Sequence, residues 1–328
     1  MADDVDWSFP ESLQPVREGL GFDLERAMDA VVAIRAEVPE DAFTAGTLGT
    51  DRGGNGVVID AAGVVLTIGY LVTEASRVWI TTRAGAVVPG YVLGYDQPTG
   101  FGLVRALGPL GVPALPRGRA AGRSVGDRVY LLSHGGRRHA LKARIRARRE
   151  FAGYWEYLVD EAIFTAPAHP EWSGAALLDD AGQLIGIGSL LTEEQADGEG
   201  SGQAKQANMS VPIDLLEPIL ENLQTTGASG LPARPWLGLY AGQSEGRLVV
   251  GGVVSGGPAD RAGVRPGDMI IEVAGRRVDA LANFLRTVWS LGAAGVEVPL
   301  LLARDGDLLT VRVASVDRAA LLHRPALH

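Results

Sequence analysis

The stretch at residues 56–72 reads GVVIDAAGVVLTIGYLV. It holds two short apolar runs, 56–59 and 64–67, separated by a segment that ends in a glycine, which is typical of neighbouring β-strands. Runs of the same kind, divided by Gly and Pro, recur at residues 31–34, 78–81, 87–93, 129–132 and 184–187. Many short strands at this spacing predict an all-β barrel or sandwich, which we place at residues 27–224.

A second domain is predicted at residues 236–316. A linker should precede it, because residues 225–235 are rich in Gly, Ser and Pro. Short strands are predicted at residues 248–254, 269–273 and 298–303. A helix is predicted at residues 280–291, capped by Asp279, and its apolar face carries Leu281, Phe284, Leu285 and Val288. This mixture indicates a small α+β domain.

The remaining segments are predicted to be connections and ends. Residues 1–26 should form an arm laid over another part of the structure, and residues 317–328 a C-terminal tail. The polar, Gly-rich residues 191–208 predict a surface loop. Residues 215–223 predict a helix, since their leucines and isoleucine recur at helical spacing.

Composition excludes several classes of function. The formal net charge of −9 disfavours nucleic acids and anionic membranes as partners. The absence of cysteine excludes disulfides and thiolate metal sites, and the spacing of the five histidines predicts neither a metal site nor a cofactor. The acidic start is unlike a signal peptide, and no apolar run approaches the roughly 20 residues of a membrane span. We therefore expect a cytoplasmic protein with no membrane contact.

Two segments of the first domain resemble motifs of the HtrA family of serine proteases. Residues 56–72 are similar to the family's strand and hairpin that bring the triad histidine into place, and Tyr70 stands at the histidine position. Residues 94–105, GYDQPTGFGLVR, resemble the segment that carries the triad aspartate, and Gly100 stands at that position. The resemblance implies a chymotrypsin-like double β-barrel.

A third segment resembles the family's nucleophile motif. Residues 171–177 read EWSGAAL and are followed by DAGQLIGI at residues 180–187. The resemblance places Ser173 at the nucleophile position, with Glu171 where the family has a glycine. The oxyanion loop would then comprise Glu171, Trp172 and Gly174 around that serine.

The second domain resembles a PDZ domain. Residues 236–239, which are Trp236, Leu237, Gly238 and Leu239, are similar to the loop that binds a peptide carboxylate. Residues 255–268 are similar to a PDZ signature. The resemblance implies a groove for a hydrophobic C-terminus or internal segment, walled by the helix with Phe284, Leu285 and Val288. Alternatively, the domain only packs against the barrel or a sister subunit.

The residues at the triad positions predict an inactive enzyme. A serine attacks only when a nearby base takes its proton and a third group orients that base. The phenol of Tyr70 titrates near pH ~10 and is a poor base, while Gly100 has no side chain to orient one. Glu171 adds a Cβ and a negative charge where the family stabilises an oxyanion. The bulky Trp172 either fills the cleft next to Ser173 or is buried in the protein interior. His134 and His169 are the alternative bases.

Three functions are compatible with these residues. The first is a catalytically inactive pseudoprotease that acts as a scaffold, adaptor or regulatory subunit through its PDZ groove. The second is a serine endopeptidase that uses Ser173 with a non-standard base, and the third is a chaperone-like holdase. The resemblance also implies a homo-oligomer, in the family a trimer, or a place in a hetero-complex, with Trp7, Phe9 and Phe22 at the contact.

One basic segment suits two interpretations. Lys142, Arg144, Arg146 and Arg148 alternate with apolar residues, which puts the charges on one face of a strand. This face either docks an acidic partner or is a solvated outer face balanced by acidic neighbours, and the second interpretation is favoured because exposed charge is common.

Overall fold

A computed structural model describes residues 7–194 and 205–323. The chain forms two compact units. The first takes in the chain up to Arg149 together with Glu161–Gly230, and the second combines Glu150–Asp160 with Leu231–Leu322. A short segment from the middle of the chain thus belongs to the C-terminal unit, which the sequence did not lead us to expect.

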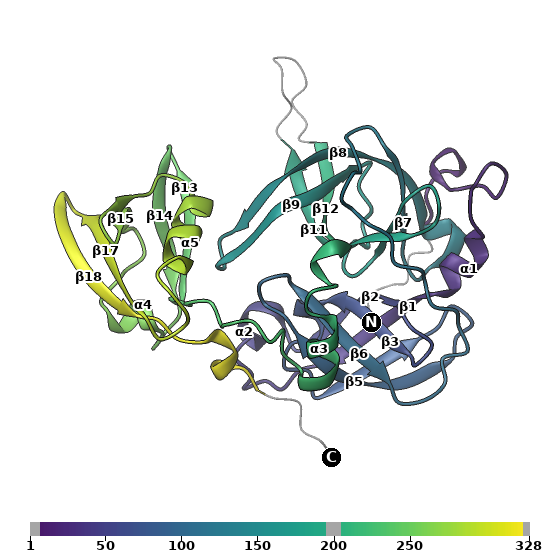
Figure 1. The fold of residues 1–328 in the computed structure, drawn as a ribbon, viewed down its shortest axis with the longest axis horizontal. Coiled ribbons are helices and arrows are strands. Elements are labelled where there is room, and N and C mark those ends of the chain that lie inside the picture. The colour runs from purple at the N-terminus through teal and green to yellow at the C-terminus, as the bar shows by residue number, and fades with distance from the viewer. Residues whose placement is uncertain (1–6, 195–204, 324–328) are drawn as a thin grey trace. The chain divides into compact units, whose positions relative to one another are not determined.

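The first unit consists of two closed six-stranded barrels, drawn in purple to blue and in teal to green in Figure 1. The strand order is β1-β2-β3-β6-β5-β4 in one barrel and β10-β11-β12-β9-β8-β7 in the other. The predicted double barrel is thereby confirmed. The strands are β1 Val31–Glu37, β2 Asp51–Val58, β3 Val64–Ile68, β4 Arg77–Thr81, β5 Val87–Tyr95, β6 Phe101–Ala106, β7 Arg128–Leu132, β8 Ala140–Gly153, β9 Tyr157–Ala166, β10 Ala176–Leu178, β11 Leu184–Glu194 and β12 Lys205–Pro212.

Aliphatic side chains fill both barrels. In the first barrel, Ile34, Val65 and Val104 are almost fully buried. The same apolar cluster continues to Leu132 and Ile187 of the second barrel, which also has a cluster of its own that includes Leu131 and Ile185. Burial of this apolar surface supplies the main driving force for their association.

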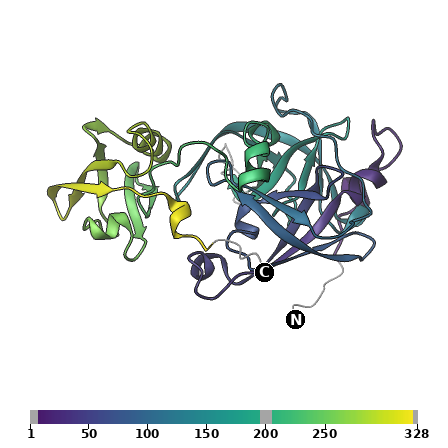
Figure 2. The same cartoon turned by 60° about the horizontal axis from the view of Figure 1, so that its bottom comes forward.

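The helices of the first unit are short. They are α1 Leu24–Asp29, α2 Ala45–Leu48 and α3 Leu220–Thr226, with 3-10 turns at Glu11–Leu13, Gly69–Leu71, Gly136–His139 and Ile213–Leu215. The helix predicted at residues 215–223 begins later, at Leu220. Pro218 explains the delay, since proline lacks an N–H and disfavours helical geometry in the residue before it. Figures 1 and 2 show α3 lying against β5, where Leu223 reaches Gly94.

The loop predicted at residues 191–208 is strand at both described ends. β11 and β12 pair from Gly186 opposite Pro212 out to Glu194 opposite Lys205. The rest of the predicted loop, residues 195–204, lies outside the described residues. Polar sequence did not prevent the ladder, because strand pairing is held by backbone hydrogen bonds.

The aromatic residues of the N-terminal arm pack on the second barrel. Trp7 stacks on His139 with ring centroids 4.0 Å apart, and Phe9 meets the edge of His169 at 5.0 Å. Phe22 lies 5.5 Å from the ring of Tyr130. The aromatic residues of the arm therefore cover parts of their own chain, while a role in an oligomer stays a prediction.

The basic segment lies in β8, and its alternation is confirmed. Arg144 and Arg146 are exposed, while the neighbouring apolar residues Ala143 and Ile145 are buried. Arg144 donates to the carbonyl of Gly126 at 2.7 Å, and Arg148 pairs with Glu161 at 3.0 Å. These local bonds favour a structural role for the face.

The second unit is a sheet with two helices. The strand order is β13-β14-β15-β17-β18, and β16 pairs with β15. The elements are β13 Leu239–Ser244, β14 Arg247–Val253, α4 Pro258–Arg261, β15 Met269–Val273, β16 Arg276–Arg277, α5 Leu281–Trp289, β17 Glu297–Arg304 and β18 Asp307–Ala314, followed by a 3-10 turn at Arg318–Leu321. The cap predicted for α5 is wrong, because Ala280 and not Asp279 is the N-cap residue and no side chain caps it.

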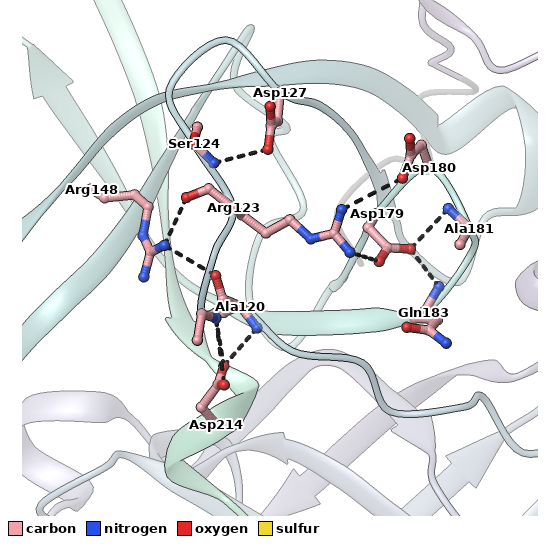
Figure 3. A network of polar contacts seen from close by, with 11 residues as sticks. Ala120, Arg123, Ser124, Asp127, Arg148, Asp179, Asp180, Ala181, Gln183 and Asp214 are labelled. Carbon is pink, nitrogen blue, oxygen red and sulfur yellow. Dashed lines mark hydrogen bonds and ion pairs between the residues drawn. The ribbon is translucent and has the colours of Figure 1, made fainter.

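A polar network ties loops of the second barrel together (Figure 3). The buried carboxylate of Asp179 accepts the N–H groups of Ala181 and Gln183 at 3.0 and 2.9 Å. It also pairs with Arg123 at 2.6 Å. Arg148 donates to the main-chain carbonyl of Arg123 at 2.7 Å, so two loops and β8 are held by one set of bonds.

Replacing Asp179 with alanine is expected to lower the free energy of unfolding by about 2–4 kcal/mol, because two N–H groups and one guanidinium lose their acceptor. Urea unfolding followed by circular dichroism measures the change. Asp180→Ala is the matched control: Asp180 is 73% exposed and lies 3.6 Å from Arg123. Its loss should cost no more than about 0.5 kcal/mol. Equal losses in both variants would contradict the role assigned to the buried carboxylate.

Candidate functional site

Ser173 and Tyr70 meet between the two barrels. Tyr70 lies in the 3-10 turn Gly69–Leu71 after β3, and Ser173 lies in the segment before β10. The phenol oxygen of Tyr70 is 2.8 Å from Oγ of Ser173 and 2.8 Å from the carbonyl oxygen of Ser189. The residue at the histidine position therefore contacts the serine, as a triad histidine would.

The chemistry of this contact differs from that of a triad. A carbonyl only accepts, so when the single phenol proton is donated to Ser189, the Ser173 hydroxyl donates to the phenol oxygen. Burial raises the pKa of Tyr70 to about 12, although its hydrogen bonds with Ser173 and Trp172 favour the charged form. The phenol thus stays neutral at physiological pH, and a neutral phenol does not take a proton from serine.

Gly100 lies beside Tyr70 without supporting it. Its carbonyl accepts the N–H of Gly69 at 2.6 Å, and its own N–H is donated to the carbonyl of Asp96 at 2.8 Å. Its φ of +81° is one that residues with a Cβ rarely adopt. The carboxylate of nearby Asp96 is engaged with the N–H and hydroxyl of Thr99.

Glu171 is turned away from the serine in both its main chain and its side chain. Its N–H is donated to Nδ1 of His169 at 3.0 Å, so this group does not point to an oxyanion. Its carboxylate accepts the hydroxyl of Ser133 at 2.8 Å and lies 3.3 Å from Nδ1 of His139. The negative charge that we expected beside the oxyanion is thus held elsewhere. The next residue, Trp172, is half-buried.

The two alternative bases differ in the contacts of their rings. Nδ1 of His169 accepts from Glu171, which leaves Nε2 to donate to the carbonyl of His139 at 2.6 Å. Burial lowers the pKa of His169, so the ring is neutral and fully used. His134 donates its main-chain N–H to Asn55 at 2.8 Å, and its Nε2 is buried without a partner in the part of the chain that the structure describes.

Asn55 is a residue of the site that the sequence did not point out. Its amide donates to the carbonyls of Glu171 and Ser173 at 3.0 and 3.1 Å, and its main-chain N–H reaches Ser173 at 2.8 Å. A Cβ on Gly54 would lie 2.8 Å from the Ser173 carbonyl, so glycine permits this close approach. Gly174 has a φ of +74°, and a Cβ on this residue would likewise collide with the carbonyl of Asn55. The sequence signal that could have pointed to Asn55 is a polar residue between two glycines at the start of a buried strand.

The predicted carboxylate-binding loop holds a carboxylate of the same unit. The N–H groups of Leu237, Gly238 and Leu239 all donate to the side chain of Glu156, which the sequence did not single out. Trp236 is buried beside this loop, and its N–H is donated to the carbonyl of Val316 at 3.0 Å. The three predicted wall residues of α5 are inside the apolar core of the second unit: Phe284, Leu285 and Val288.

The geometry agrees with comparisons to known proteins. A model of the trypsin-like peptidase domain matches residues 54–187, and a model of the PDZ domain matches residues 235–314. The putative serine protease HhoA of Synechocystis sp. is 30% identical over 292 residues, which cover 80% of this chain and 71% of that protein. The chain belongs to the HtrA family of serine proteases. The predicted family resemblance is therefore confirmed, whereas the inactivity of this member stays a prediction.

Two further relatives are less similar in sequence. Serine endoprotease DegS of Salmonella typhimurium is 25% identical over 276 residues, covering 79% of this chain and 75% of that protein. A probable periplasmic serine endoprotease DegP-like of Chlamydia pneumoniae is 24% identical over 275 residues, covering 79% and 54%.

Solved structures share the fold. The serine endoprotease from Yersinia pestis aligns with a TM-score of 0.52 at 23% identity, covering 90% of this chain and 96% of that one. The HtrA-type protease AlgW with decapeptide aligns with a TM-score of 0.53 at 21% identity, covering 92% and 98%.

No helix among residues 7–194 and 205–323 has the length and apolar character needed to cross a membrane.

Changing Asn55 to aspartate should destabilise the first unit by at least about 2 kcal/mol, because the new carboxylate cannot donate to two carbonyls and is buried. Urea unfolding measures the effect. The same change at the exposed Asn222, which donates to Ser229 at 3.1 Å, should cost no more than about 0.5 kcal/mol. A small effect at both positions would contradict the bridging role of Asn55.

The raised pKa of Tyr70 predicts how its contribution to stability depends on pH. Because the folded value of about 12 lies above the ordinary value, the contribution is complete below about pH 10 and is lost as pH rises through 12. The ultraviolet absorbance of tyrosinate tests this in the protein and in Tyr70→Phe. Their difference should titrate near pH 12, and a midpoint near 10 would show that the phenol is not buried as described.

Proposed function

We propose that this HtrA-family protein binds polypeptide through its PDZ domain without cleaving it, and acts as a scaffold, adaptor or regulatory subunit. The observation that carries the proposal is the 2.8 Å contact between the Ser173 hydroxyl and the phenol of Tyr70. A residue that is neutral at physiological pH stands where catalysis needs a base. We therefore expect the protein to share the fold and the peptide groove of the family, but not its reaction.

Three further observations support the absence of cleavage. Gly100 offers no carboxylate to orient a base, and its positive φ disfavours the aspartate of the family. The N–H of Glu171 is committed to His169. Loss of a single triad member lowers turnover by a factor of order ten thousand to a million, so these losses together predict no measurable proteolysis.

A serine endopeptidase is the competing function, because the relatives are named serine proteases. It would need a base for Ser173 other than Tyr70. Both ring nitrogens of His169 are occupied, which argues against this histidine. A chaperone-like holdase requires no chemistry at Ser173 and is compatible with the same geometry.

Binding of a protein terminus is supported by the second unit. The PDZ match covers residues 235–314, and the HtrA-type protease AlgW was solved with a decapeptide. Three N–H groups that converge on a carboxylate suit the end of a peptide chain. We propose a protein with a hydrophobic C-terminus or segment as the partner. The formation of a trimer or a hetero-complex stays a prediction. A cytoplasmic location also stays a prediction, and one relative is named as a probable periplasmic protease.

A fluorophosphonate probe tests the proposal, because it labels only an activated serine. We expect neither labelling of Ser173 nor cleavage of casein by the full-length protein, with trypsin as the positive control. Tyr70→His should remain unlabelled, since Gly100 and Glu171 are unchanged. Labelling or casein cleavage that disappears in Ser173→Ala would overturn the proposal in favour of the endopeptidase.

A further inference from the structure

Glu156 occupies an unusual position in the β8–β9 hairpin. It ends the turn between the two strands, and its φ is +61°, in the left-handed region. Glycine is the usual residue there, because a Cβ makes this conformation unfavourable. A glutamate that is held in such a conformation indicates that its side chain makes compensating contacts.

The compensating contacts are hydrogen bonds to the loop at residues 237–239. The carboxylate of Glu156 accepts from Leu237 at 3.0 and 3.2 Å, from Gly238 at 2.8 Å and from Leu239 at 3.2 Å. Gly238 has a φ of +73°, which helps successive N–H groups to converge in an anion-binding nest. Glu156 is only 7% exposed. These are the N–H groups that the family resemblance assigned to a peptide carboxylate.

The rest of the hairpin also makes contacts suited to a bound peptide. The carbonyl of Tyr154 accepts the N–H of Ala241 in β13 at 3.3 Å, which adds main-chain pairing beside that strand. Leu158 is buried in the apolar core of the second unit. Arg286 of α5 forms ion pairs with Glu150 and Asp160 on the two arms of the hairpin. The hairpin therefore contacts the loop, β13 and α5 at once.

We propose that Glu156 is an internal ligand of the PDZ domain, and that a free C-terminal carboxylate binds only by displacing this side chain. The inference rests on the proposed peptide-binding function and adds its regulation. A side-chain carboxylate and a terminal carboxylate need the same three donors, so one loop cannot hold both. The apparent affinity for a peptide is then lowered by the fraction of molecules whose loop is occupied.

The charges around Glu156 indicate how pH acts on this competition. Burial raises the pKa of Glu156 to about 7. The three N–H groups and the charge of Arg318 favour the anion and oppose this rise, but burial has the larger effect. Because the docked value is raised, docking is strongest below the ordinary glutamate value and weakens as pH rises through 7. Arg286, Glu150 and Asp160 pair with one another on the arms of the hairpin. A competing terminal carboxylate should therefore gain as the pH increases.

Amide hydrogen exchange in the full-length protein tests whether the loop is occupied in solution. The N–H groups of Leu237, Gly238 and Leu239 should exchange more slowly in the parent than in Glu156→Gly. Glycine suits the positive φ, so this variant keeps the turn and removes only the carboxylate. Glu161→Ala is the matched control in β9, where the carboxylate pairs with Arg148 outside the second unit. Equal exchange in the parent and Glu156→Gly would overturn the inference.

Fluorescence polarisation tests the competition, with fluorescein-labelled hexapeptides that end in an apolar residue and a free carboxylate, and with their C-terminal amides as controls. Glu156→Gly should bind the free acids at least about tenfold more tightly than the parent or Glu161→Ala. The parent and Glu161→Ala should gain affinity from about pH 5 to 8, whereas Glu156→Gly should not. Equal affinity of the parent and Glu156→Gly would overturn the inference and leave peptide binding intact. If neither binds any peptide, the proposed function fails, and the competition with it.

Discussion

The side chain of Asn55 joins β2 of the first barrel to the segment that carries Ser173. Its amide and main-chain N–H hold the carbonyls of two residues in that segment, and its Oδ1 accepts from His134. All of these groups are buried or half-buried, so each bond replaces one that water would otherwise make. With the backbone fixed in this way, the Ser173 hydroxyl is held against Tyr70. The close approach also depends on Gly54 and Gly174, where a Cβ would collide with the facing carbonyls.

The residues that differ from the family's motifs are connected by this geometry. The phenol of Tyr70 satisfies the serine hydroxyl and a carbonyl together, which leaves the serine with a structural hydrogen bond in place of a base. Glu171 turns its N–H toward His169 and its carboxylate toward Ser133, so the main chain that would stabilise an oxyanion is committed to the protein itself. Both the side chains and the backbone bonds of the site are thus arranged for stability, which is why binding is the function that we propose.

The second unit presents a related arrangement, in which the protein fills its own recognition site. The hairpin is formed by β8 and β9, two strands of the second barrel. Its residues Glu150–Asp160 nevertheless belong to the compact unit that contains the PDZ match. The strain of a glutamate at positive φ is offset by hydrogen bonds from three main-chain N–H groups to its buried side chain. A preformed internal contact of this kind lowers the affinity for external peptides and makes their binding depend on the hairpin.

The sequence was sufficient for the architecture, because it depends on patterns of many residues. Short apolar runs predicted the strands, and three ordered motifs placed Tyr70, Gly100 and Ser173 in the fold before any contact was known. Local boundaries were less predictable: Pro218 delayed α3, and backbone pairing extended β11 and β12 into polar sequence. Asn55 and Glu156 could not be assigned a role in advance, because their partners lie about 80 or more residues away along the chain. A carboxylate or an amide acquires its function from the donors and acceptors that folding brings to it, and that encounter depends on long-range packing.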